Sequence, residues 1–183
     1  MFSRAMLFSA IIAVTSFMGV SHAGIIQQVD CSFSSQVAGQ SYIFNVDTQT
    51  LTLSESVLES GALIGMTGLT VGDPTFNLSV SVQNNTDFAW TSYELTLLGT
   101  GAQFDYTTEP SSSHFHFANK LPTVLTFTAP NAVNPGESVL LNFAINIPNP
   151  GQFSFSMQQT AAPEPLTLAL LGIGGLVLRI RNK

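Results

Sequence analysis

Residues 75–83 read TFNLSVSVQ, a stretch in which apolar and small polar side chains alternate at every position. Successive side chains of an extended chain point to opposite faces, so the four apolar residues, Phe76 to Val82, share one face. This period of two predicts a β-strand that is buried on one side. VLLNFAINI at residues 139–147 repeats the pattern and predicts a second strand of the same kind.

Shorter segments of similar character follow along the chain. They lie at 24–33, 41–46, 50–54, 90–98, 103–107, 114–117, 123–129 and 153–157. Turn-forming sequences separate several of them, namely QNNTD at 83–87, NPGE at 134–137 and PNPG at 148–151. Many short strands without a long amphipathic helix predict an all-β fold, an antiparallel β-sandwich. Residues 54–63 are the one place where a short helix or irregular loop is expected.

Charge is scarce and unevenly placed. The chain of 183 residues is 45% apolar and only 9% charged. Between residues 24 and 162, ten carboxylates face a single base, Lys120, which gives a net charge of −9. Such a body repels phosphate backbones, so nucleic-acid binding is excluded as its function.

The N-terminus has the anatomy of a secretory signal peptide. Arg4 precedes an uncharged, largely apolar stretch at 5–20, and Ser21-His22-Ala23 gives the small-x-small pattern of a cleavage site. We therefore predict a signal helix at residues 1–23, cleavage between Ala23 and Gly24, and export of the body.

The C-terminus ends in three parts. They are Pro163, Glu164 and Pro165, then an apolar run at 166–178, then the basic residues Arg179, Arg181 and Lys183. As a helix the apolar run would cover about 20 Å of a hydrocarbon core that is roughly 30 Å thick, so it predicts a short transmembrane helix. The basic residues are expected to hold the end in the cytoplasm as a stop.

These three parts resemble the PEP-CTERM sorting tail of exported proteins from Gram-negative bacteria. The resemblance implies recognition of Pro163, Glu164 and Pro165 by an exosortase, a membrane-embedded transpeptidase-like protease. It also implies passage through the inner membrane to the cell surface or extracellular matrix, with extracellular polysaccharide or glycans as further partners. The expected domains are a signal peptide at 1–23, a β-sandwich at 24–160 and a sorting tail at 161–183.

The body resembles immunoglobulin-like and fibronectin-like bacterial surface domains at two places. They are SVSVQNNTDFAWTSYELTLLG at 79–99 and VNPGESVLLNFAINI at 133–147. Trp90 and Tyr93 in the first segment have two interpretations. They are aromatic residues of the core and edge, or they form a platform on which sugars stack.

The sequence predicts no catalytic, cofactor or metal site. His114 and His116 are the two histidines of the mature chain and would share one face of a strand, but a catalytic metal usually takes a third protein ligand. The chain has neither a Gly-x-Ser-x-Gly motif nor a calcium loop of the EF-hand type. Cys31 is the single cysteine, so it is expected to be an idle thiol, with pairing between molecules as the alternative.

Together these features predict a non-enzymatic exported protein with a structural or adhesive role. Two alternatives stay open. One is a carbohydrate-binding or ion-binding β-sandwich module, and the other is an envelope protein that is stably anchored by its tail.

Overall fold

The computed structural model describes residues 24–99 and 101–163. These residues form twelve β-strands and no α-helix. The strands are β1 Ile25–Phe33, β2 Val37–Asn45, β3 Thr50–Val57, β4 Ala62–Val71, β5 Thr75–Asn84, β6 Trp90–Gly99, β7 Gln103–Asp105, β8 Ser111–Ser112, β9 His116–Lys120, β10 Val124–Val133, β11 Ser138–Asn146 and β12 Gly151–Pro163. The expected signal helix and transmembrane helix lie outside the described residues.

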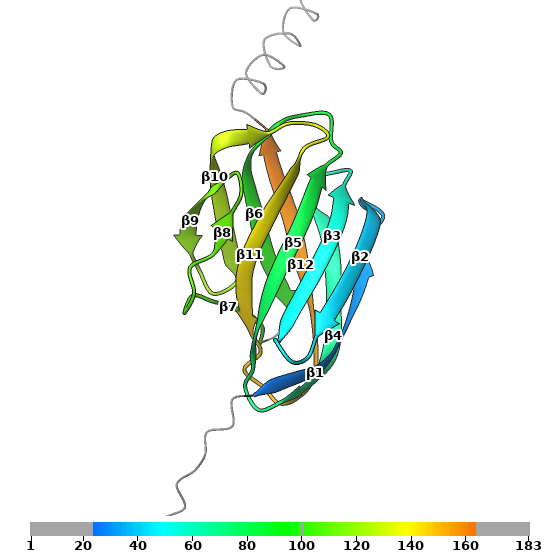
Figure 1. Cartoon of the computed structure of the whole chain (residues 1–183), viewed down its shortest axis with the longest axis vertical. Helices are drawn as coiled ribbons and strands as arrows, with labels where there is room; N and C mark the ends of the chain where they lie inside the picture. Colours follow the sequence, from blue (N-terminus) through cyan, green and yellow to red (C-terminus); the bar gives the residue numbers. More distant parts are fainter. Residues whose placement is uncertain (1–23, 100, 164–183) are drawn as a thin grey trace, which may run out of the picture.

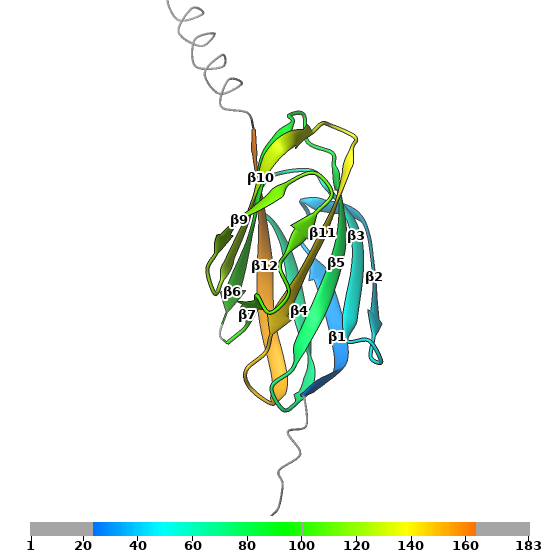
Figure 2. The same ribbon diagram turned by 60° about the vertical axis from the view of Figure 1, so that its left-hand side comes forward.

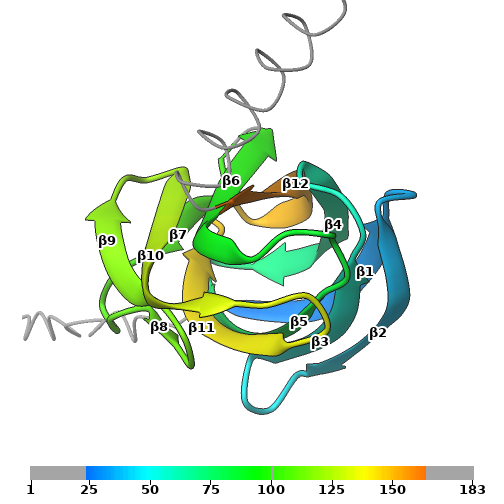
Figure 3. The same cartoon turned by 90° about the horizontal axis from the view of Figure 1, so that it is seen from above.

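Two sheets pack face to face, as the view from above shows (Figure 3). Sheet A has the strand order β1-β4-β12-β6-β10-β9. Sheet B has the order β2-β3-β5-β11-β7, and β8 also pairs with β11. The predicted all-β fold with two packed sheets is confirmed.

One pair of strands corrects the expectation of a purely antiparallel sandwich. β3 and β5 run parallel, with Thr50 opposite Asn77 and Val57 opposite Asn84. Parallel neighbours need a crossover, because a tight hairpin reverses the chain. Here β4 is the crossover. It comes after β3 and before β5 along the chain, but it belongs to sheet A. The other strand pairs among the described residues are antiparallel.

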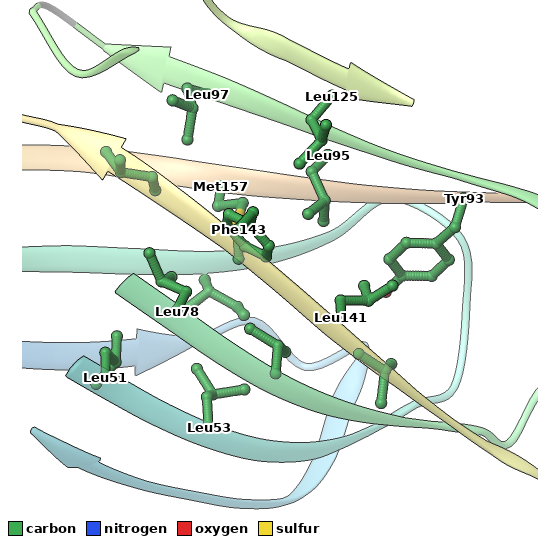
Figure 4. Packing of buried hydrophobic residues seen from close by; sticks show 14 of the residues in the cluster. Leu51, Leu53, Leu78, Tyr93, Leu95, Leu97, Leu125, Leu141, Phe143 and Met157 are labelled. Atoms are coloured by element: carbon green, nitrogen blue, oxygen red, sulfur yellow. The ribbon is translucent and has the colours of Figure 1, made fainter. Parts of the chain in front are cut away.

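The core fills the space between the sheets with side chains from alternate positions (Figure 4). The apolar residues Phe76 to Val82 of the opening stretch are at most 1% exposed, as their period predicts. Leu141 and Phe143 of β11 point into the same space from the same sheet, and Leu95 and Met157 face them from sheet A. Burial of these side chains away from water supplies the main favourable contribution to folding.

The turn between β5 and β6 is built around one buried amide. Asn84 Nδ2 donates to the carbonyl oxygens of Phe88 and Val133, each at 2.9 Å. Asn84 Oδ1 accepts from the backbone nitrogen of Thr86 at 2.9 Å and from its hydroxyl at 2.6 Å. Because Asn84 is fully buried, these bonds also replace the water that its amide loses on folding. The predicted turn at 83–87 is therefore tied to the end of β10.

Residues 54–63 form neither a helix nor an irregular loop, so that expectation is wrong. β3 continues to Val57, and β4 begins at Ala62 after a short turn in which Gly61 has a φ of +89°. Nothing in the sequence pattern predicts β4 itself, because Gly65 and Gly68 interrupt it and glycine weakens a strand interior. The structure gives both glycines a packing role beside β1 and β12.

A matched pair of substitutions tests how closely β4 is packed. A Cβ on Gly68 would lie 2.1 Å from the carbonyl oxygen of Gln28 and 2.6 Å from the ring of Phe153. Gly68→Ala is expected to lower the free energy of unfolding by about 1–3 kcal/mol, because the backbone of β1 has to move. At Gly65 the close atom is the hydroxyl oxygen of Ser32, which can rotate away, so Gly65→Ala is expected to cost clearly less. Equal losses in urea unfolding of the two variants would contradict this prediction.

Candidate functional site

The predicted signal cleavage site borders the folded body. Ala23 lies outside the described residues, and Gly24 is the first residue of the described chain. The backbone of Gly24 lies against the turn between β4 and β5. A Cβ at this position would be 2.4 Å from the nitrogen of Asp73 and 2.5 Å from the nitrogen of Pro74. The residue expected to begin the mature chain is therefore one where only glycine fits.

The first residue of the predicted sorting motif belongs to the sandwich. Pro163 is the last residue of β12 and lies opposite Trp90 of β6. The hydroxyl of Thr91 donates to the Pro163 carbonyl oxygen at 3.3 Å. The boundary expected between residues 160 and 161 consequently falls inside β12. Glu164 and Pro165, the apolar run and the basic residues Arg179, Arg181 and Lys183 lie outside the described residues.

The two ends of the described chain lie at opposite ends of the sandwich. β1 begins at the lower end in Figure 1, and β12 finishes at the upper end. Figure 2 shows the same arrangement from another side. Within residues 24–99 and 101–163, the structure contains no helix with the length and apolar character needed to cross a membrane.

Trp90 and Tyr93 are core residues, so the interpretation as a sugar-stacking platform is wrong. Both side chains have 0% of their surface exposed. The indole nitrogen of Trp90 donates to the Thr86 hydroxyl at 3.0 Å, and its ring centroid lies 5.2 Å from that of Tyr93. The Tyr93 hydroxyl donates to Oε1 of Gln159. A sugar ring cannot reach either aromatic face.

The two histidines are not joined by a third ligand. His114 is half-buried, with Nδ1 at 2.9 Å from the hydroxyl of Ser113. His116 begins β9 and is exposed. Among the residues that the structure describes, no group of three or more His, Cys, Asp or Glu side chains could hold a metal ion. His114 and His116 are therefore close in the sequence, but no third ligand among the described residues completes a metal site with them.

Cys31 is half-buried, and its thiol is kept protonated. Burial raises its pKa to about 12, and the carboxylates of Asp30 and Glu55 add to the rise. The thiolate is the reactive form of cysteine, so this thiol is a poor nucleophile at neutral pH. The environment favours the interpretation as an idle thiol.

Glu55 is a buried acid at an inward-facing position of β3. Its side chain is 2% exposed, and burial raises its pKa to about 7. The amide of Gln159 lowers this pKa somewhat, but neither the carboxyl oxygens nor Nε2 of Gln159 completes a hydrogen bond within the described residues. Burial also raises the pKa of Tyr93, and Glu55 adds to that rise.

The arrangement of Glu55, Gln159 and Tyr93 can hold a proton, but it is closed to a substrate. Perturbed acids often mark active sites when they line a cleft. Here the carboxyl faces the space between the sheets, and Gln159 and Tyr93 are also at most 1% exposed. The cluster therefore acts on the stability of the fold.

An open groove lies on the outer face of sheet B, where the polar residues of the alternating strands gather. We call it the outer-face groove; it has a volume of about 260 Å³. Its lining comes from four segments and includes Thr50, Asn77, Ser79, Glu109, Ser111 and Asn142. The pairing Ser79↔Asn142↔Ser111 forms one row across β5, β11 and β8. Glu109 is the one charged residue of the lining.

The sequence predicts which residues of the outer-face groove face the solvent, but it does not predict that these residues come together. Ser79 is a polar member of the opening stretch, and Asn142 is the corresponding residue of the stretch at 139–147. Their place on a solvent face follows from the period of two. That the two strands are neighbours, and that residues 108–111 close one side, depends on long-range pairing.

Comparison with known proteins adds no family. No family model, no curated protein and no solved structure matches the chain. The function is therefore inferred from features of the chain itself. These features are the two predicted ends, the buried acid and the outer-face groove.

The buried acid predicts a defined dependence of stability on pH. The folded pKa of Glu55, about 7, lies above its usual value of 4.5, so the folded state binds the proton more tightly. The contribution of Glu55 to the free energy of unfolding is fully present below about pH 4.5. It is lost as the pH rises toward 7 and above. The loss amounts to ~3 kcal/mol for the 2.5-unit difference between the two pKa values.

Glu55→Gln removes this titration while keeping the size of the side chain. The variant is expected to match the wild type near pH 4.5 and to exceed its free energy of unfolding at pH 8. Urea unfolding of both proteins between pH 4 and 8 provides the measurement. Exposed Glu59→Gln is the matched control and should track the wild type at every pH. A constant difference between Glu55→Gln and the wild type across this range would disprove the prediction.

Proposed function

We propose that this chain is an exported protein of a Gram-negative bacterium that an exosortase-type enzyme sorts through the C-terminal tail. Its β-sandwich serves a structural or adhesive role at the cell surface or in the extracellular matrix and performs no catalysis. The predicted signal peptide and the three-part tail support the route. The resemblance of the tail assigns recognition to Pro163, Glu164 and Pro165.

One observation carries this proposal, namely that among the described residues the buried apolar cluster ends before the motif begins. The buried apolar cluster runs from Ile26 to Ala161, and β12 finishes at Pro163. Processing near the motif would thus remove no side chain from that cluster. A cut after Pro163 would therefore leave the described part of the sandwich intact.

We also propose that the body is a variant of the immunoglobulin-like or fibronectin-like sandwich. Support comes from the segments that carry the resemblance, because β5 and β11 pair along their whole length in sheet B. Trp90 lies in the core, as a large aromatic residue of such sandwiches usually does. The parallel pair β3–β5 is a departure from an all-antiparallel arrangement.

The processing step is tested by the intact mass of the protein from cells with and without the sorting enzyme. With the enzyme, the wild type is expected to lose the mass of the residues beyond the motif. Glu164→Gln is expected to keep its full tail, because the motif loses its charge. Asp47→Asn, which changes an exposed carboxylate in the turn between β2 and β3, is the control and should be processed normally. Retention of residues 166–183 in every sample would instead indicate a stably tail-anchored protein.

A second candidate function is the binding of a neutral polysaccharide in the outer-face groove. The hydroxyl and amide groups of Ser79, Ser111 and Asn142 can exchange hydrogen bonds with sugar hydroxyls. The negative charge of the body opposes acidic polymers. This site replaces the buried Trp90 and Tyr93 as the basis of the carbohydrate-binding alternative.

Removing one amide from the outer-face groove tests this second candidate. Asn142→Ala is expected to weaken binding of a soluble neutral glucan several-fold, measured by affinity electrophoresis in gels that contain the glucan. Asn119→Ala, on the exposed strand β9, is the matched control and should migrate like the wild type. Alginate, an acidic polymer, should retard none of the three. Equal retardation of the two variants by the glucan would rule out the outer-face groove as the site.

A further inference from the structure

Strand β2 forms an unpaired edge of sheet B. It pairs with β3 on one side, and no described strand pairs with its other side. In Figures 1 and 3 it lies at the margin of the molecule. Ile43 is 71% exposed, and the strand from Val37 to Asn45 contains no charged residue and no proline. Its free backbone groups are therefore open to pairing with another strand.

The other sheet edges carry features that discourage such pairing. β1 presents Asp30, β9 presents Lys120, and the three-residue β7 ends in Asp105. Charges and short length are common ways to protect an edge. β2 has one irregularity, a register shift between Ala38 and Ser41. Its regular part, residues 41–45, has none of these protections.

The regular part of β2 is complementary to itself in antiparallel pairing. With Ile43 at the centre, Ile43 of one copy meets Ile43 of the other on the outer face. Ser41 then meets Asn45, which pairs a hydroxyl with an amide. On the inner face Tyr42 meets Phe44, because these two lie opposite the buried residues of β3. Cross-strand contacts of these kinds stabilise a sheet.

Charge favours this strand as the contact between two copies. The body carries a net charge of −9, so most of its surfaces repel one another. The nearest acid to the regular part along the chain is Asp47, and in this register it lies opposite Gly39 of the second copy. The two Asp47 side chains therefore stand at opposite ends of the contact, and no like charges face each other across it.

We propose that β2 binds β2 of a second copy in antiparallel register centred on Ile43, so that two copies of sheet B become one continuous sheet. The contact is two-fold symmetric and closed, because each β2 occupies the free side of the other. A single pair of strands buries less than the roughly 1,600 Å² of a standard interface, so the dimer is weak and forms at high local concentration. The proposal is independent of the sorting route.

The first test is sedimentation of the full chain in mild detergent over a range of concentrations. The wild type is expected to shift from monomer to dimer. Ile43→Lys is expected to raise the dissociation constant at least tenfold, since two ammonium groups would meet at the centre. Leu140→Lys changes a side chain that is 42% exposed on β11, an interior strand of sheet B, and should behave like the wild type. An unchanged dissociation constant for Ile43→Lys, with native circular dichroism, would overturn the proposal.

The second test reads the register directly. In a Cys31→Ser background, Ile43→Cys places two thiols against each other at the symmetry axis. Mild oxidation of the full chain, at a concentration at which sedimentation shows the dimer, is expected to give a covalent homodimer. Leu140→Cys in the same background should stay monomeric. Absence of the Ile43→Cys homodimer, or a mixed disulfide with a different protein in cells, would refute pairing between two copies.

Discussion

The packing of two apolar sheet faces against each other is the constraint on which every other feature depends. Each strand contributes alternate side chains to it, so the outward residues are fixed once the inward ones are chosen. The outer-face groove and the exposed side of β2 both follow from this choice. In a chain with few charges, the outward positions are filled mostly by Ser, Thr, Asn and Gln.

This packing accepts a few polar side chains between the sheets, and they differ in how well they are satisfied. Asn84 makes four hydrogen bonds and fixes a turn. Glu55 has no partner among the described residues and occupies a position that a leucine would suit. The first adds to the specificity of the fold, because its partners exist only when β5, β6 and β10 are in place. The second makes the stability of the fold depend on pH, since a charge on the buried carboxyl group is costly.

The sequence predicts the strands whose period is uninterrupted, and the structure confirms those at 75–83 and 139–147. It does not predict β4, where glycines hide the period, nor the parallel pairing of β3 with β5, which depends on a crossing between sheets. The inward position of Glu55 was visible in TLTLSESV, where it follows Leu51 and Leu53 at the same spacing. The motif at 163–165 consists of adjacent residues, so the sequence alone predicts it. The outer-face groove is assembled from segments that are distant in the sequence, so the sequence alone does not predict it.

The positions of Gly24 and Pro163 at opposite ends of the sandwich have a mechanical consequence. β1 and β12 both pair with β4 and both run antiparallel to it, so they point in the same direction. A pull on the two ends of the body then draws β1 and β12 along β4 in opposite senses. Each of the two ladders is loaded in shear, so the hydrogen bonds along a ladder must break together, whereas in a peeling geometry they would break one at a time. The arrangement therefore suits a body that bears tension between its termini.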